Sequence, residues 1–548
     1  MEEVYTYESP FELSIVPITR PESKPDCEID LMHHEFGNCY YKPYVGPYTP
    51  DEKCKGKIIK KAILTWKGYC KGTQYDRVAA VWIDGIEILR TSTAEPTQIG
   101  LSWEFSVDIT RYRSLFYKDR TLTVSLNNIV NDQYTGSFII DIKLEIYLDS
   151  TPNISKPEPI YQRPADDFIG ISQFGQNSEP WYTIENNKSI KFKLPQISSS
   201  TQRALLEVFI TGHGKEEFHQ FNTPDDPRKE GDQNTRGPLR ELHVSVNGIE
   251  AGVGWPFPVI FTGGVCPALW RPISGIGSFS ADPIRFEFSQ FIGDLIKNSN
   301  SEIELLVSPS IPFWHITGNL HLWYSDDEIK NNSGMLNSNS LKFSINPQVE
   351  TNFDNSAVNF KTKANRSYLQ KGYIDRKDGR IQVETSRKLT FHHDLQYFKD
   401  TDKQIYDFTA NVITETRFLH FPPELEPDNE NQAGVQELHK ESFDSKWRFF
   451  GQTEYQPCEP YGSLIDASMT ADVSHKDYIG DQLVRELNVS QHNTGVFGRI
   501  PDMPFVIDGS SNGTVNYFNK YETEEERFNR SIKTEHGWTV QDSNNTRC

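Results

Sequence analysis

The chain has 548 residues, which predicts three to four domains at about 150 residues each. Aromatic residues reach 12% of the composition, which excludes a disordered chain. The formal net charge of −20 argues against nucleic-acid and anionic-membrane partners, because binding either requires a basic surface. No apolar run is long enough to span a bilayer, and the opening MEEVYTYESP has neither the basic nor the apolar region of a signal peptide.

Alternation of apolar and polar residues with a period of two dominates the chain and predicts an all-β fold. In chain order, Asp84-Gly85 predicts a β-hairpin with a type I′ turn, and Asp108 is a potential N-cap for a short helix, ITRYRSLF. The clearest strand is FIIDIKLEIYL, residues 138–148, and Asn247-Gly248 predicts a second hairpin. Further alternating runs predict strands at residues 121–128, 189–195, 284–291 and 340–346.

The segments around the two hairpins repeat in the same order. Residues 62–77, the first hairpin and residues 134–148 correspond to residues 204–218, the second hairpin and residues 316–324. The offset grows along the chain, which predicts longer loops in the second copy.

We therefore predict two tandem antiparallel jelly-roll sandwiches, residues 1–155 and 156–326, joined by the proline-rich linker 151–166. Residues 327–548 predict a third, β-rich region whose topology the pattern does not define.

The chain has seven cysteines, four of them before residue 71, and no C-x-x-C motif. This spacing favours a few disulfides around the first domain over a zinc or redox site, and the odd number leaves at least one cysteine unpaired or paired between chains. The N-x-[S/T] sequons add modest support for a secreted glycoprotein, and they begin at Asn153, Asn187, Asn331, Asn365, Asn488, Asn512, Asn529 and Asn544.

Two carboxylates occupy matching places in the repeat. Asp76 lies 14 residues after Ala62, and Glu217 lies 13 residues after Ala204. If the two sandwiches pack side by side, both acids face one cleft and can divide acid and base roles. The alternative is structural: Asp76 forms a charge pair with the adjacent arginine that closes a loop, and Glu217 belongs to a solvated surface.

Other motifs point less sharply to a function. Trp82, Trp103, Trp255 and Trp270 accompany glycine-rich loops, where they either stack on sugars or pack in the core. Two pairs of adjacent histidines raise a copper-monooxygenase alternative, but neighbouring side chains on a strand point to opposite faces. Motifs of serine hydrolases, zincins and P-loop NTPases do not occur. We predict neither a metal nor a cofactor.

Three stretches resemble a known family: YDRVAAVWIDGIEILRTSTAEPTQIGLSWEFSVDITRY (75–112), NNIVNDQYTGSF (127–138) and WPFPVIFTGGVCPALWRPISGIGSF (255–279). They resemble the plant and fungal A-type peptide-N4-(N-acetyl-β-glucosaminyl)asparagine amidases, over roughly residues 24–326. A fainter similarity joins the bacterial F-type enzyme, a double jelly roll, whose W-D-R and A-E-W motifs fall on 75–77 and 216–218. The resemblance therefore selects Asp76 and Glu217, the same acids as the internal repeat.

The resemblance implies hydrolysis of the amide between the innermost N-acetylglucosamine and asparagine, giving aspartate and a glycosylamine. It implies that Asp76 is the main catalytic carboxylate and that Glu217 orients water or the N-acetyl group. Arg77 would hold the carboxylates in place, and Trp270 would form part of the wall of the sugar site. The F type has a third glutamate where this chain has Asn128, an amide that cannot act as a base, so Glu95 is a candidate substitute. The predicted substrate-binding residues are Arg77, Glu95, Trp103, Asn128, His213, Arg240, Trp270 and Arg271.

Two other functions are weighed against the amidase. One is a non-catalytic glycan-binding protein on the same sandwiches, and the other is an endoglycosidase that cuts within the chitobiose core, also with two carboxylates. The predicted partner is an N-glycopeptide or a denatured glycoprotein, bound by a monomer. We expect the chain to work in the secretory pathway, outside the cell or in an acidic vacuolar or lysosome-like compartment.

Overall fold

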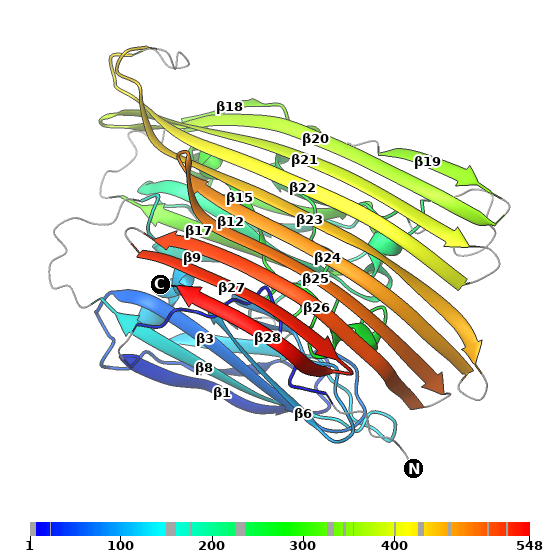
Figure 1. Ribbon diagram of the computed structural model, residues 1–548. Helices are drawn as coiled ribbons and strands as arrows, with labels where there is room; N and C mark the ends of the chain where they lie inside the picture. Colours follow the sequence, from blue (N-terminus) through cyan, green and yellow to red (C-terminus); the bar gives the residue numbers. More distant parts are fainter. Residues whose placement is uncertain are drawn as a thin grey trace.

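The computed structural model is all-β, and its strands form five antiparallel sheets (Figure 1). It describes residues 7–21, 24–149, 160–175, 178–224, 236–325, 334–343, 347–354, 356–398, 402–425, 432–458, 462–500, 503–521 and 524–547. None of the helices within these ranges is long and apolar enough to cross a membrane.

The first sandwich has two four-stranded sheets, ordered β1-β8-β3-β6 and β2-β7-β4-β5. The strand predicted from alternation is β8, in which every second side chain is buried. The segment after Asp108 forms a 3-10 helix, η1 (Thr110–Tyr117), and Asp108 accepts a hydrogen bond from the Thr110 amide at 2.9 Å. The strands are β1 (Cys27–Phe36), β2 (Tyr44–Tyr48), β3 (Ile59–Cys70), β4 (Val78–Ile83), β5 (Ile86–Ser92), β6 (Leu101–Asp108), β7 (Arg120–Leu126) and β8 (Phe138–Leu148).

The second sandwich repeats this topology. Its sheets have the order β10-β17-β12-β15, with β9 beside β17, and β11-β16-β13-β14. Both predicted hairpins turn through positive φ angles, 48° and 79° at Asp84-Gly85 and 51° and 80° at Asn247-Gly248. The strands are β9 (Asp167–Ile171), β10 (Tyr182–Ile184), β11 (Ile190–Lys193), β12 (Thr201–Gly212), β13 (Glu241–Val246), β14 (Ile249–Gly254), β15 (Ile284–Glu287), β16 (Glu302–Ser308) and β17 (Trp314–Tyr324).

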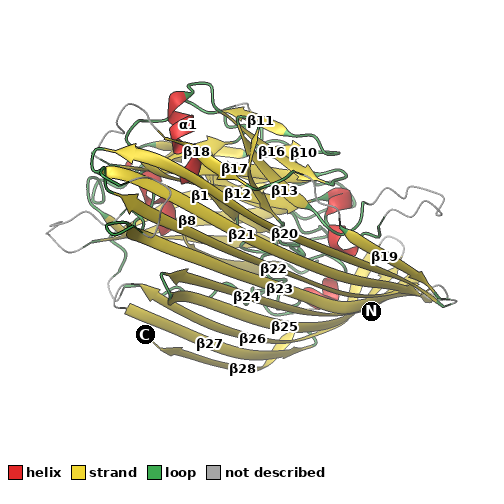
Figure 2. Cartoon of the chain, turned by 90° about the horizontal axis from the view of Figure 1, so that it is seen from above, coloured by secondary structure: helices red, strands yellow, loops and turns green. Residues whose placement is uncertain are grey.

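Residues after 333 form one sheet of eleven strands, several of them about twenty residues long. In Figure 1 this sheet lies in front of the second sandwich, and Figure 2 shows it from above as a curved layer of long strands. The strands are β18 (Gly334–Asn339), β19 (Gln348–Phe353), β20 (Ala357–Arg376), β21 (Gly379–Phe398), β22 (Asp402–Phe421), β23 (Gln436–Cys458), β24 (Gly462–Ile479), β25 (Gln482–Ile500), β26 (Met503–Tyr521), β27 (Glu524–Glu535) and β28 (Trp538–Arg547).

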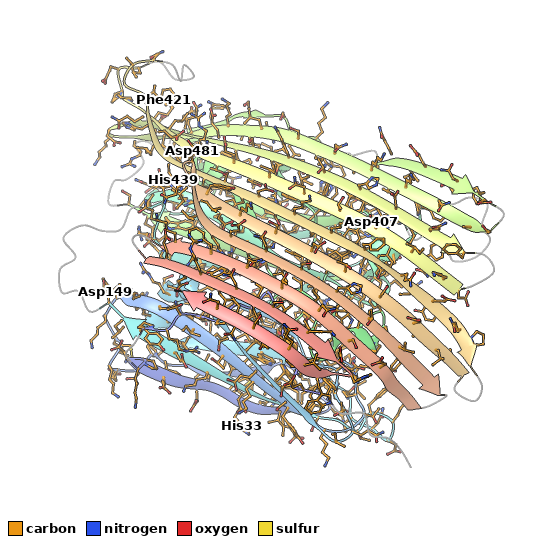
Figure 3. All side chains as sticks on the ribbon, viewed as in Figure 1. His33, Asp149, Asp407, Phe421, His439 and Asp481 are labelled. Carbon is orange, nitrogen blue, oxygen red and sulfur yellow. A yellow bond between two sulfur atoms is a disulfide. The ribbon has the colours of Figure 1, made fainter. Side chains whose placement is uncertain are left out.

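The large sheet has one face toward the sandwiches and one toward solvent. On β26, Asn512, Thr514 and Asn516 are exposed and the residues between them are buried. The outward face carries ion pairs such as Arg448–Asp407 at 2.8 Å, and Figure 3 shows Asp407 among its side chains. The inward face contributes Trp447 and Phe449 to a core shared with Trp255 and Trp270. The third region is therefore a single sheet that packs on the rest of the molecule.

One predicted strand differs from the structure. The predicted strand at 340–346 is wrong for residues 340–343, which form no strand, and 344–346 lie outside the described residues. The carbonyls of Lys342 and Phe343 accept hydrogen bonds from the Arg366 guanidinium instead of from a neighbouring strand. Most of the predicted linker, residues 151–159, lies outside the described residues.

One disulfide, Cys27–Cys54, joins β1 to the loop before β3 in the first domain. Cys39, Cys70 and Cys266 are free thiols in the part of the chain that the structure describes. The prediction of disulfides around the first domain is thus confirmed for one pair.

The two sandwiches meet through buried charged groups. Arg90 of β5 pairs with Glu87 at 2.6 Å, and both side chains are at most 1% exposed. The Arg90 guanidinium also donates to Thr211 Oγ1 of the second sandwich at 2.8 Å, and Asn319 exchanges two hydrogen bonds with the Glu87 backbone. At a second contact, Tyr112 donates to Glu207 Oε2 at 2.7 Å. Thr211, Asn319 and Glu207 of the second sandwich thus bond buried polar groups of the first, and these hydrogen bonds favour the one relative orientation of the sandwiches that satisfies them.

We expect Glu87→Ala to destabilise the protein by about 3–5 kcal/mol, because it leaves the Arg90 charge buried without its partner. The measurement is the free energy of unfolding in urea. Asp407→Ala is the matched control, since the exposed pair that it breaks contributes about 1 kcal/mol or less. Equal losses in the two variants would contradict the structural role of the buried pair.

Candidate functional site

Three carboxyl groups meet at the junction of the two sandwiches. Asp76 lies in the loop between β3 and β4, and Glu95 follows β5. Glu217 directly follows η2 (Gly214–Glu216), a short 3-10 helix after β12. Because β3 and β12 are equivalent strands of the repeat, their ends carry equivalent loops, and the docked sandwiches bring these together. The negative charge of Asp76 acts on Glu217, so the predicted pair does lie close together.

Asp76 and Glu95 form a hydrogen-bonded pair. The Asp76 backbone amide donates to Glu95 Oε2 at 2.8 Å, and the two side-chain carboxyl groups share a further hydrogen bond. Gly263, in the loop after β14, closes over both groups and donates its backbone amide to Asp76. A Cβ at Gly263 would lie 2.6 Å from Glu95 Oε2 and 2.7 Å from Asp76 Oδ1, so a larger residue would displace the carboxyl groups.

Burial sets the protonation of the three groups. Burial, with the charge of Asp76, raises the pKa of Glu95 to about 8, although Arg271 acts in the opposite direction. Burial and the same Asp76 charge raise the pKa of Glu217 to about 8. The pKa of Asp76 is also raised by burial, but the Gly263 amide, Arg77 and the Glu95 hydrogen bond oppose this shift. Since burial and the Asp76 charge raise both pKa values to about 8, Glu95 and Glu217 hold protons at neutral pH.

Two arginines flank the carboxyl groups. The Arg77 guanidinium donates to Gln74 Oε1 at 2.7 Å and to Tyr40 Oη at 3.2 Å. Arg271 lies over the ring of Tyr7, 4.7 Å from its centroid. Tyr7 in turn donates to the backbone carbonyl of Glu95 at 2.8 Å. The structure thus brings the predicted residues Asp76, Arg77, Glu95, Glu217 and Arg271 together.

The other predicted site residues are buried supports rather than exposed binding groups. Arg240 is 2% exposed, and its guanidinium pairs with Glu216 Oε2 at 2.7 Å and donates to the Gly237 carbonyl at 2.7 Å. It holds Glu216, the neighbour of Glu217, and its buried donors face protein groups, so substrate binding by Arg240 stays a prediction.

His213 is likewise buried, stacked on Phe261 with ring centroids 5.6 Å apart. Burial and the charge of Arg90 lower the pKa of His213 to about 3, so this ring stays neutral. Asn128 is fully buried and donates to the carbonyls of Phe36 and Gly136 at 3.0 and 3.1 Å. Both side chains are buried, and their contact with substrate stays a prediction.

The four tryptophans pack in the core, as the second of the two alternatives predicted. Trp82, Trp103, Trp255 and Trp270 are each at most 4% exposed. Trp103 packs against Phe138 inside the first sandwich. Trp270 donates its indole N–H to the Gly264 carbonyl at 2.8 Å, so it supports the loop of Gly263 instead of walling a sugar site.

Sequence reasoning missed the exposed tyrosines beside Asp76. Tyr75 is 40% exposed and packs on Tyr134, with ring centroids 5.5 Å apart. Tyr40 and Tyr41 are 37% and 69% exposed and form an edge-to-face pair beside Arg77. The sequence could have pointed to one of them, because Tyr75 immediately precedes Asp76. Gly263 was missed because only the folded chain places a backbone against two carboxyl groups.

The fold and the site define a double jelly roll whose acid–base centre lies between its two sandwiches. Residues 16–341 match the family described as peptide N-acetyl-beta-D-glucosaminyl asparaginase amidase A, and the chain belongs to this family. A relative from Prunus dulcis, peptide-N4-(N-acetyl-beta-glucosaminyl)asparagine amidase A, is 31% identical over 417 residues, covering 74% of this chain and 72% of that protein. The resemblance predicted from the sequence is confirmed.

Solved structures of F-type amidases also align with this chain. Recombinant N-glycanase F matches with a TM-score of 0.35 and 13% identity, covering 54% of this chain and 95% of that chain. The PNGase F of Flavobacterium meningosepticum matches with a TM-score of 0.34 and 13% identity, covering 54% of this chain and 96% of that chain.

We expect Glu217→Gln to raise the melting temperature at pH 8 by roughly 2–4 °C or more and to change it little at pH 4.5. The unfolded carboxyl group ionises near pH 4.5, whereas burial raises its folded pKa to about 8. The contribution of this protonated group to stability is therefore fully present below pH 4.5 and is lost as the pH rises toward 8. Glutamine is neutral throughout and removes this loss. Calorimetry across the range tests the sign, and a variant destabilised at pH 8 would contradict it.

Proposed function

We propose that this chain hydrolyses the amide between the innermost N-acetylglucosamine and asparagine of N-glycopeptides or glycoproteins. The products are aspartate in the peptide and a glycosylamine, which decays to ammonia and free glycan. The observation that carries this proposal is the carboxyl centre, in which Asp76 lies beside a protonated Glu217. An amide is a stable bond, so its hydrolysis requires both a base for water and an acid for the leaving nitrogen.

The protonation states assign a role to each acid. Asp76 accepts a proton from water while the water oxygen attacks the carbonyl carbon of the side-chain amide. Glu217 gives its proton to the departing nitrogen as the carbon–nitrogen bond breaks. One proton has then been taken from water and one delivered to the amine, and transfer from Asp76 to Glu217 restores the starting state. This assignment makes Glu217 a proton donor, beyond the orienting role that the sequence suggested.

The neighbouring groups keep Asp76 ionised and oriented. Glu95 donates a hydrogen bond to the Asp76 carboxylate and keeps its proton, which leaves the other lone pairs of Asp76 for water. Arg77, fixed by Gln74 and Tyr40, adds positive charge beside the base. Glu95 therefore supplies the third carboxyl group of the site, as proposed from the replacement of a glutamate by Asn128.

Three exposed tyrosines and the half-buried Tyr134 extend the site away from the carboxyl groups. Tyr75, Tyr134, Tyr40 and Tyr41 come from three loops, and hydrogen bonds such as Tyr41 N–H to Asn127 Oδ1 at 2.8 Å join these loops. Aromatic faces with polar tips suit the apolar faces and hydroxyl groups of sugar rings. The tyrosines, rather than the predicted tryptophans, thus provide the surface for the glycan core.

Asp76→Asn is expected to lower kcat on an N-glycopeptide by about 10²–10⁴-fold, because an amide cannot accept the proton of water. Mass spectrometry of the treated peptide provides the assay. Conversion of asparagine to aspartate identifies an amidase, a single remaining sugar identifies an endoglycosidase, and an unchanged peptide identifies a binder. Asp407→Asn, on the outward face of the large sheet, is the control. Full activity of Asp76→Asn, with loss of activity in Glu95→Gln, would refute the assignment of the base.

Tyr75→Ala should raise KM by roughly 3- to 10-fold with a smaller change in kcat, because it removes a stacking surface but no proton-transfer group. Tyr75→Phe keeps the ring and serves as the control. Steady-state kinetics on a glycopeptide measure both constants, and an unchanged KM in Tyr75→Ala would remove the tyrosine from the binding surface.

We also propose that the chain works in the secretory pathway or in an acidic compartment. The Cys27–Cys54 disulfide supports an oxidising environment, and Glu217 stays protonated at acidic pH. The monomeric state stays a prediction.

A further inference from the structure

The loop that carries Gly263 is enclosed between the carboxyl centre and the large C-terminal sheet. We propose that this sheet positions the catalytic base, and that Gly495 and Gly509 are the positioning residues through which it acts. The inference rests on the proposed function, because it concerns the geometry of Asp76. It assigns a catalytic contribution to a region of more than two hundred residues that contains none of the three carboxyl groups of the site.

Gly495 and Gly509 are cross-strand partners on β25 and β26. Over this pair lies η4 (Pro267–Trp270), a short 3-10 helix in the loop after β14. A Cβ at Gly495 would lie 2.7 Å from both the Cβ and the carbonyl carbon of Ala268, and a Cβ at Gly509 would overlap the Ala268 carbonyl oxygen. The two glycines thus form a flat notch in the sheet, and the backbone of η4 rests directly on the backbone of the strands.

From this notch a short chain of contacts leads to the base. Trp270, the last residue of η4, donates its indole N–H to the carbonyl of Gly264 at 2.8 Å. The adjacent residue, Gly263, donates its amide to Asp76. On the same loop, Thr262 Oγ1 donates to the Thr93 carbonyl at 2.8 Å, and Thr93 Oγ1 accepts the Arg77 amide at 2.9 Å. A displacement of η4 is therefore transmitted to the two residues that hold Asp76 and Arg77.

The sheet holds the rest of the loop as well. Phe257 packs between Trp447 and Phe449, with ring centroids 5.9 and 5.6 Å away. Gln491 on β25 donates its side-chain amide to the Ser274 carbonyl at 3.1 Å. These contacts flank η4 on both sides in the sequence, so the loop is anchored before, at and after the notch. The exposed tyrosines lie on loops of the first sandwich and make none of these contacts.

Because the sheet contacts the loop of Gly263 but not the exposed tyrosines, it should affect kcat and leave KM nearly unchanged. If η4 moves, Asp76 loses the Gly263 amide that favours its ionised form, and its pKa rises. The acid limb of the pH–kcat profile then shifts to higher pH, and kcat falls. KM changes little, because the tyrosine surface keeps its place. A purely structural role of the sheet would lower stability without moving the profile.

The test compares Gly509→Ala with Gly372→Ala. Gly372 on β20 is a matched control, because a Cβ there would overlap the carbonyl oxygen of Gln290 in another 3-10 helix, η5 (Ser289–Phe291), away from the site loop. We expect both variants to lose thermal stability. Only Gly509→Ala should lower kcat, by about tenfold or more, and shift the acid limb upward, with KM within about twofold of the parent. Equal kinetic effects in the two variants, or none in Gly509→Ala, would overturn the proposal.

Two further measurements keep the proposal testable, the Gly495→Ala variants and the assay of the parent chain. If Gly509→Ala does not fold, Gly495→Ala is measured, alone and with Ala268→Gly, which removes one of the three overlapping atoms. Partial rescue of kcat by Ala268→Gly supports the notch, and a Gly495→Ala variant with parental kcat and acid limb refutes it. The parent chain is assayed for conversion of asparagine to aspartate in parallel. An inactive parent would refute the proposed function itself, whereas an active parent with unaffected glycine variants would refute only this inference.

Discussion

The site depends on the buried polar interface between the two jelly rolls. Arg90 and Glu87 pair within β5 and lie in a water-excluded contact, where an unsatisfied polar group costs free energy. Thr211 and Asn319 of the second sandwich bond the Arg90 guanidinium and the Glu87 backbone, so this contact is satisfied when the two sandwiches dock in the observed register. Asp76 and Glu217 come from different sandwiches, and their proximity therefore follows from the satisfaction of these polar groups.

Burial at the same junction gives the carboxyl groups their chemistry. Three acids close together in water would each carry a charge at neutral pH, but desolvation and mutual repulsion favour a single charge here. The Gly263 amide and Arg77 place that charge on Asp76. The burial that keeps Glu95 and Glu217 protonated also lowers the stability of the folded state at higher pH, where these groups ionise. Such a trade of stability for activity is common at active sites.

Much of the fold and part of the site could be predicted from the sequence. Alternation identified β8, the Asp-Gly and Asn-Gly turns identified the hairpins, and the repeat located Asp76 and Glu217 on equivalent loops. Trp103, Trp270, His213, Arg240 and Asn128, which were also predicted to bind substrate, are buried, and residue type does not reveal exposure. Tryptophan and arginine suit both a ligand and a core, and here Trp270 and Arg240 are buried as supports one layer behind the carboxyl groups. The large sheet was recognised only as β-rich, since strand pairing among its long segments is a long-range property.

The sequence by itself determined the all-β class and the duplication, because these follow from local periodicity, turn chemistry and spacing along the chain, and the family resemblance together with the repeat selected Asp76 and Glu217 as the candidate acids. Only the tertiary structure decided which acid holds a proton, which aromatic residues face solvent and what lies behind the site. Those properties depend on desolvation and on contacts between segments hundreds of residues apart, such as Gly263 against Asp76 and Gly509 against Ala268. No local pattern encodes them, because the free energy of each contact is defined only once the three sheet systems have docked.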